Sequence, residues 1–95
     1  MLATILAKLI DHAVTKPTQP MAHRFTNGLR ISVTYYENAR QFNLILARYK
    51  VLPSLTEWGT VLKNWPYPVR VKPQIGDQDG RHYLIAMLPV HPKLF

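Results

Sequence analysis

Residues 29–36 of this 95-residue chain alternate between apolar and polar side chains. The buried set is expected to be Leu29, Ile31, Val33 and Tyr35, and the exposed set Arg30, Ser32, Thr34 and Tyr36. A period of two is typical of a strand with one face in the core. Asn27-Gly28 precedes the segment and favours a tight turn with positive φ. Residues 23–26 are therefore expected to pair back onto the start of this strand.

Three further segments resemble strands. Residues 41–51 and 81–88 carry apolar side chains on both parities, and the first of them is predicted to be a central strand covered on both sides near its middle. Residues 69–75 alternate, but Pro73 has no N–H for pairing, so this strand is expected either to lie at an edge of the sheet or to be broken there. Residues 76–80 begin and end with glycine, which predicts a turn.

Two segments have the pattern of helices. Residues 1–15 form an amphipathic pattern and should dock on the chain's own core or on a second copy. Two prolines within 16–22 predict a linker after it. Ser54 and Glu57 have the spacing of a capping box at the start of a second helix. Its two tryptophans are expected to be core residues.

The order of these segments predicts an α+β fold. The amphipathic helix (1–15) and the linker (16–22) precede a ββαββ domain at 23–92. Short polar turns favour antiparallel hairpins. A helix between two hairpins packs on one face of a four-stranded antiparallel sheet.

The sequence offers little material for catalysis. It has no cysteine and five acidic residues, so we expect no catalytic residue, metal site or cofactor. Asp77, Asp79 and Gly80 resemble part of a calcium loop, but its terminal glutamate is missing. His82 beside these aspartates leaves a one-metal nuclease as a minor alternative. The lack of cysteine fits the cytoplasm, and no apolar stretch reaches the ~18–20 residues of a membrane span, so no membrane partner is expected.

The charge gives the strongest functional indication. Twelve Lys+Arg against five Asp+Glu leave a net charge of +7, and the cations are scattered over the predicted strands. Parity gathers several of them on one sheet face, where cations neutralise phosphates and rings such as Tyr36 or Tyr49 stack on bases. We therefore predict a noncatalytic nucleic-acid-binding domain, for DNA or RNA. Its predicted binding residues are Arg30, Tyr36, Arg48, Lys50, Arg70, Lys72 and Arg81.

The same features admit an alternative function. A basic face also docks on acidic protein surfaces, and an amphipathic helix on a proline-containing arm suits helix-in-groove binding. The alternative is thus a small adaptor or inhibitor of a larger protein complex. The first helix would equally suit a homodimer that exchanges this element between copies.

Overall fold

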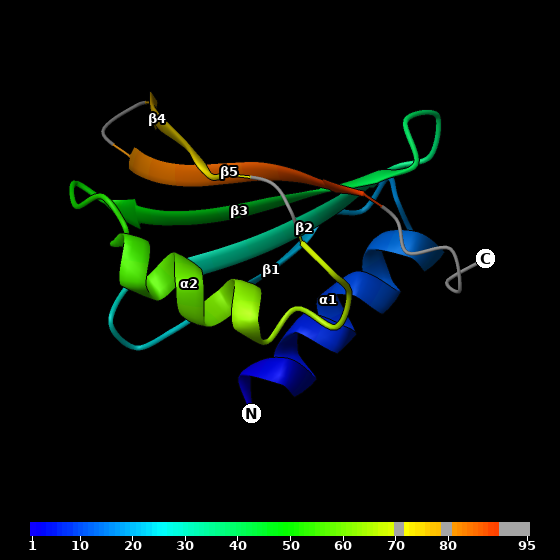
Figure 1. Cartoon of the computed structure of the whole chain (residues 1–95), viewed down its shortest axis with the longest axis horizontal. Helices are drawn as coiled ribbons and strands as arrows, with labels where there is room; N and C mark the ends of the chain where they lie inside the picture. The colour runs from blue at the N-terminus through cyan, green and yellow to red at the C-terminus, as the bar shows by residue number, and fades with distance from the viewer. Residues whose placement is uncertain (70–71, 79–80, 90–95) are drawn as a thin grey trace.

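The computed structural model describes residues 1–69, 72–78 and 81–89, without the side chains of Gln78 and Arg81. The fold is α+β, as predicted. In chain order the elements are α1 (Leu2–Thr15), β1 (Met21–Arg24), β2 (Arg30–Tyr36), β3 (Gln41–Tyr49), α2 (Leu55–Lys63), β4 (Gln74–Gln78) and β5 (Arg81–Pro89). Figure 1 shows both helices below a single twisted sheet.

The sheet is antiparallel and has the order β1-β2-β3-β5-β4. It contains five strands rather than the four predicted, because β1 pairs with the start of β2 through a turn at Asn27-Gly28. Gly28 has a φ of 86°, and the Asn27 side chain accepts a hydrogen bond from the Leu29 N–H at 3.0 Å. β1 begins at Met21, inside the range expected to be a linker. The predicted central position of β3 is confirmed.

The edge strand β4 lies later in the chain than predicted. It begins at Gln74, directly after Pro73. Proline has no backbone N–H to donate to a neighbouring strand, which favours a strand that starts after it. Gly76 and Asp77, predicted as turn residues, are therefore paired with β5. A Cβ at Gly76 would overlap the ring of Tyr83, so this glycine leaves room for the tyrosine. Residues 70–71 and 79–80 lie outside the described part.

The core lies between the sheet and the two helices. One helix was predicted to cover the sheet, and residues 1–15 were expected to dock on the chain's own core or on a second copy. In the structure α1 packs on the same side of the sheet as α2, against β1 and β2 of its own chain. The capping box of Ser54 and Glu57 and the burial of both tryptophans are confirmed. The buried side chains include Leu6, Leu9 and Ile10 of α1, Trp58 and Val61 of α2, and Ile31, Val33, Phe42, Leu44, Leu46, Leu84 and Leu88 of the strands.

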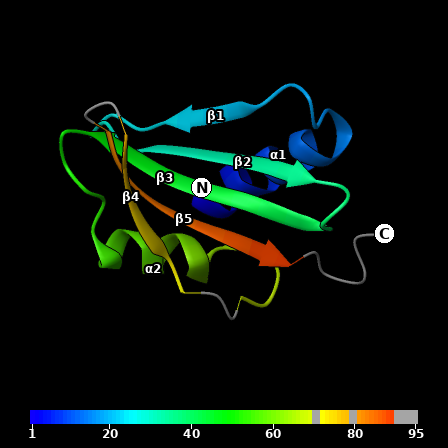
Figure 2. The same ribbon diagram turned by 90° about the horizontal axis from the view of Figure 1, so that it is seen from above.

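The opposite side of the sheet carries no described element (Figure 2). The expectation that β3 is covered on both sides is therefore not met within residues 1–69, 72–78 and 81–89. On this side of the sheet Ile45 of β3 is paired directly with Ile85 of β5, and both are half-buried. The two side chains form an apolar strip. Among the described residues, neither helix is long and apolar enough to cross a membrane.

Candidate nucleic-acid interface

The sheet surface that faces away from both helices is here called the open face. Directly paired residues share a side of the sheet, and burial along β2 and β3 alternates, so the register assigns each position. Its principal residues are Arg24 of β1, Arg30, Ser32, Thr34 and Tyr36 of β2, Gln41, Asn43, Ile45, Ala47 and Tyr49 of β3, and Tyr83, Ile85 and Met87 of β5.

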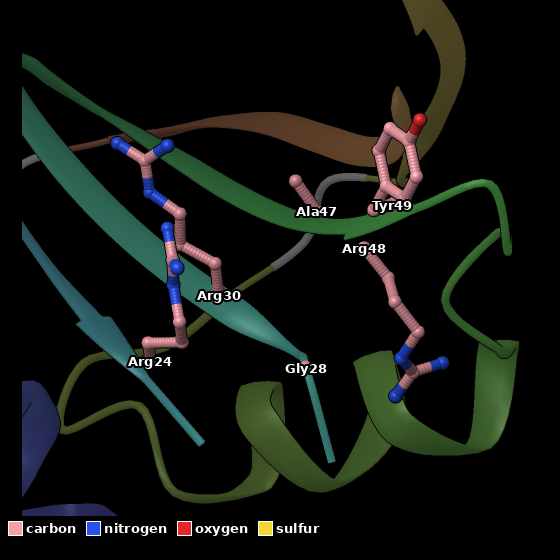
Figure 3. A pocket seen from close by; sticks show the side chains of 6 residues that line it. All are labelled: Arg24, Gly28, Arg30, Ala47, Arg48 and Tyr49. Atoms are coloured by element: carbon pink, nitrogen blue, oxygen red, sulfur yellow. The ribbon is translucent and has the colours of Figure 1, made fainter. Parts of the chain in front are cut away.

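Two arginines stand side by side at one end of the open face. Arg24 and Arg30 are direct cross-strand partners in the β1–β2 pair. Figure 3 shows their side chains running in parallel on the same side of the sheet. Within the described residues, neither guanidinium has a hydrogen bond or an ion pair. Like charges placed directly opposite each other destabilise a sheet, so this pair is not explained by the stability of the fold.

An aromatic ring and a third cation lie at the same end. Tyr49 is 64% exposed at the end of β3, and the Lys50 ammonium lies 5.1 Å from the centre of its ring. We name Arg24, Arg30, Tyr49 and Lys50 the basic corner. These two arginines and Tyr49 line an open depression of about 320 Å³, together with Gly28, Ala47 and Arg48 (Figure 3). The basic corner thus combines guanidinium donors with a ring available for stacking.

The described acidic side chains lie away from the open face. In the described part of the chain, Asp11 is on α1, Glu37 is in the β2–β3 turn and Glu57 is on α2. Asp77 belongs to the parity that faces the helices, where its carboxylate lies 3.4 Å from Nδ1 of His82. No cluster of three metal-ligating side chains occurs among the residues described. The positive charge of Arg24 and Arg30 is therefore not neutralised from within this face.

Arg48, one of the predicted binding residues, does not lie on the open face. It occupies the parity of β3 that faces the helices and points toward α2 in Figure 3. Its Nη1 donates to Oε1 of Glu57 at 3.1 Å, and its Nη2 forms an ion pair with Oε2. Glu57 Oε1 also accepts the Ser54 N–H at 3.0 Å. The charge of Arg48 is used to attach the start of α2 to β3.

This ion pair predicts an acid-sensitive contribution to stability. The Arg48 guanidinium, by hydrogen bonding, lowers the pKa of Glu57 below its ordinary value of 4.5. A lowered folded-state pKa means that the stabilisation is present above pH 4.5 and is lost as the pH falls through the lowered value. We expect Glu57→Gln to destabilise the protein at pH 7 and to differ much less from the parent at pH 3. Urea unfolding at both pH values measures this, and an equal difference at both would contradict it.

The other predicted residues are distributed around the sheet. Tyr36 is on the open face but at the end opposite the basic corner. Lys50 directly follows β3 and has a φ of 59°, so the alternation of the strand does not assign it to a face of the sheet. It belongs to the basic corner because its ammonium lies beside the ring of Tyr49. Lys72 is exposed but precedes β4 and lies in no strand. Arg70 and the Arg81 side chain lie outside the described residues.

The site list from the sequence lacked two members of the basic corner. Arg24 was omitted because β1 was not counted as a full strand, although the Asn27-Gly28 turn already implied that Arg24 would lie opposite Arg30. Tyr49 is expected from the sequence to be a ring suited to stacking but is not among the predicted binding residues, and the register places it on the open face. Comparison of the chain with models of known protein families, with curated proteins and with solved structures found no match.

Proposed function

We propose that this protein binds nucleic acid, without catalysis, through the open face of its sheet. The observation that carries the proposal is the unpaired arginine pair Arg24–Arg30 beside the exposed ring of Tyr49. Two like charges held opposite each other raise the free energy of the unbound protein. A phosphate between them removes that repulsion and accepts hydrogen bonds from both guanidinium groups.

The rest of the open face supplies groups suited to the same ligand. Ser32, Thr34 and Asn43 are half-buried polar residues that can hydrogen-bond to sugars, phosphates or bases. Tyr36, 46% exposed, adds a second ring at the far end. Cations, hydroxyl groups and aromatic rings together are the side chains that protein surfaces use for nucleic-acid backbones and bases.

A salt-dependent titration tests the proposal. If Arg24, Arg30 and Lys50 neutralise three phosphates, log K should fall against log salt with a slope between about −2.1 and −2.7. Affinity for a fluorescein-labelled 12-nucleotide DNA should then drop about 20- to 40-fold between 50 and 200 mM NaCl. Fluorescence anisotropy measures both values.

The contrary results are distinct. No binding at 50 mM NaCl overturns the proposal, as does binding with no salt dependence. A test with polyglutamate of similar charge checks whether any polyanion suffices. Equal affinity for polyglutamate would point to an acidic protein surface as the partner instead.

A further inference from the structure

We propose, on the basis of the nucleic-acid binding just described, that the ligand is a single strand lying along β2 and β3. Its backbone would be anchored by Arg24 and Arg30, and its bases would stack on Tyr49 at one end and on Tyr36 at the other. The inference depends on how apolar, aromatic and charged groups are distributed over the open face.

An apolar strip lies on the part of the open face formed by β3 and β5. Ile45 and Ile85 are direct partners across the β3–β5 pair, and Met87, two residues further along β5, is 37% exposed. A duplex presents mainly phosphates and sugars to a flat protein surface. Contact with the apolar strip would remove water from those phosphates without replacing the hydrogen bonds that the water made. The unstacked bases of a single strand are apolar on their faces and can cover the strip.

The two exposed rings have a separation that fits a short strand. Tyr36 is paired with Gln41, and Tyr49 lies eight positions after Gln41 on β3. At about 3.3 Å per residue, the backbone positions that carry the two rings are some 26 Å apart along the sheet. This length suits the lower end of the ~4–16 nucleotides covered by one small single-strand-binding fold.

The charge is concentrated where one backbone segment would pass. The described cations on the strands of the open face, Arg24 and Arg30, lie at the same end, with Lys50 beside them. Electrostatic anchoring of a duplex across the face would need cations spaced along two backbones. One cationic end followed by an apolar strip and a second ring matches a single backbone whose bases turn toward the sheet.

The test compares one sequence in two forms. A labelled 12-nucleotide oligothymidylate is titrated alone and as a duplex with oligoadenylate, at 50 mM NaCl. We expect the single strand to bind at least about 10-fold more tightly than the duplex, and affinity to level off beyond about six nucleotides in a length series. The matching RNA strand then shows whether the sugar matters.

Ring substitutions provide a second readout. Tyr49→Leu and Tyr36→Leu keep apolar bulk but remove the stacking surface, so each should weaken single-strand binding about 5- to 150-fold. Tyr49→Phe and Tyr36→Phe keep the ring and should bind like the parent. Both residues are exposed, so circular dichroism should show unchanged folding in all four variants.

The outcomes separate the two proposals. Duplex affinity equal to or above single-strand affinity overturns the single-strand inference and leaves nucleic-acid binding intact. Leucine variants that bind like the parent also overturn the inference, because the rings then do not stack on bases. Absence of binding to either form overturns the proposed function itself.

Discussion

Reversing both charges of the arginine pair, Arg24→Glu with Arg30→Glu, should reduce affinity for a 12-nucleotide strand by at least about 100-fold. A hydrogen bond to a charged group contributes about 1.5–3 kcal/mol, and two are lost while two repulsive carboxylates appear. Each 1.4 kcal/mol corresponds to a factor of ten. The stability of the fold should hardly change, because one like-charge cross-strand pair replaces another. Anisotropy and urea unfolding measure the two quantities separately.

A matched control separates local contacts from net charge. Lys8 and Lys63 are exposed on α1 and α2, on the side of the sheet away from the open face. Lys8→Glu with Lys63→Glu changes the net charge from +7 to +3, the same change as the arginine double variant. We expect this control to weaken binding less than about 10-fold, since its charges are largely screened at such distances. Equal losses in both double variants would show that no defined site exists.

The single variant Arg24→Glu makes a sharper distinction. It places a carboxylate directly opposite Arg30, so the cross-strand pair becomes attractive and the fold gains about 0.2–1 kcal/mol. The same variant removes one phosphate contact and should bind more weakly. Stability and affinity thus move in opposite directions, as expected where a function maintains a locally unfavourable pair. If Arg24→Glu lowers both the free energy of unfolding and the affinity, Arg24 stabilises the fold rather than binding the ligand.

Local signals in the sequence predicted most of the fold. The alternation in 29–36, the Asn27-Gly28 turn and the Ser54–Glu57 capping box each have a short-range cause, and each is present in the structure. The position of β4 depends on a cross-strand contact, because Gly76 is paired with Tyr83 of β5 and leaves room for the tyrosine ring. Spacing along the chain does not encode that contact, so the glycine was interpreted as part of a turn.

The candidate site was less predictable than the fold for a related reason. Parity assigns a strand residue to a face only where the strand has one buried side, as β2 does. Arg48 and Tyr49 are adjacent and so lie on opposite faces, but β3 is apolar on both parities, and parity alone does not say which of the two lies on the open face. The structure places Arg48 against Glu57 and Tyr49 on the open face. Whether Arg48 contacts Glu57 or a bound ligand depends on tertiary contacts that the sequence alone does not show.

The second large effect concerns α1, whose Leu6 is fully buried, with 0% exposure. Leu6→Ala should lower the free energy of unfolding by about 2–5 kcal/mol, since it removes buried methyl groups and leaves a cavity. That is a large share of the roughly 5–14 kcal/mol expected for a 95-residue domain. Leu55→Ala is the matched control, because Leu55 also lies on a helix but is 67% exposed. It should cost less than about 0.5 kcal/mol in the same urea titration.

This comparison also measures what release of α1 would cost. The apolar face of α1 is already covered by β1 and β2, and His12 Nε2 lies 2.6 Å from the Gln19 carbonyl oxygen, which ties the helix to the segment that follows it. An adaptor that offered this helix to a partner would first have to lift Leu6, Leu9 and Ile10 out of the core. If Leu6→Ala costs as little as Leu55→Ala, α1 is loosely held and docking through it becomes favourable. If Leu6→Ala costs the expected amount, binding through the apolar face of α1 is disfavoured, which agrees with our proposal that the ligand binds the open face.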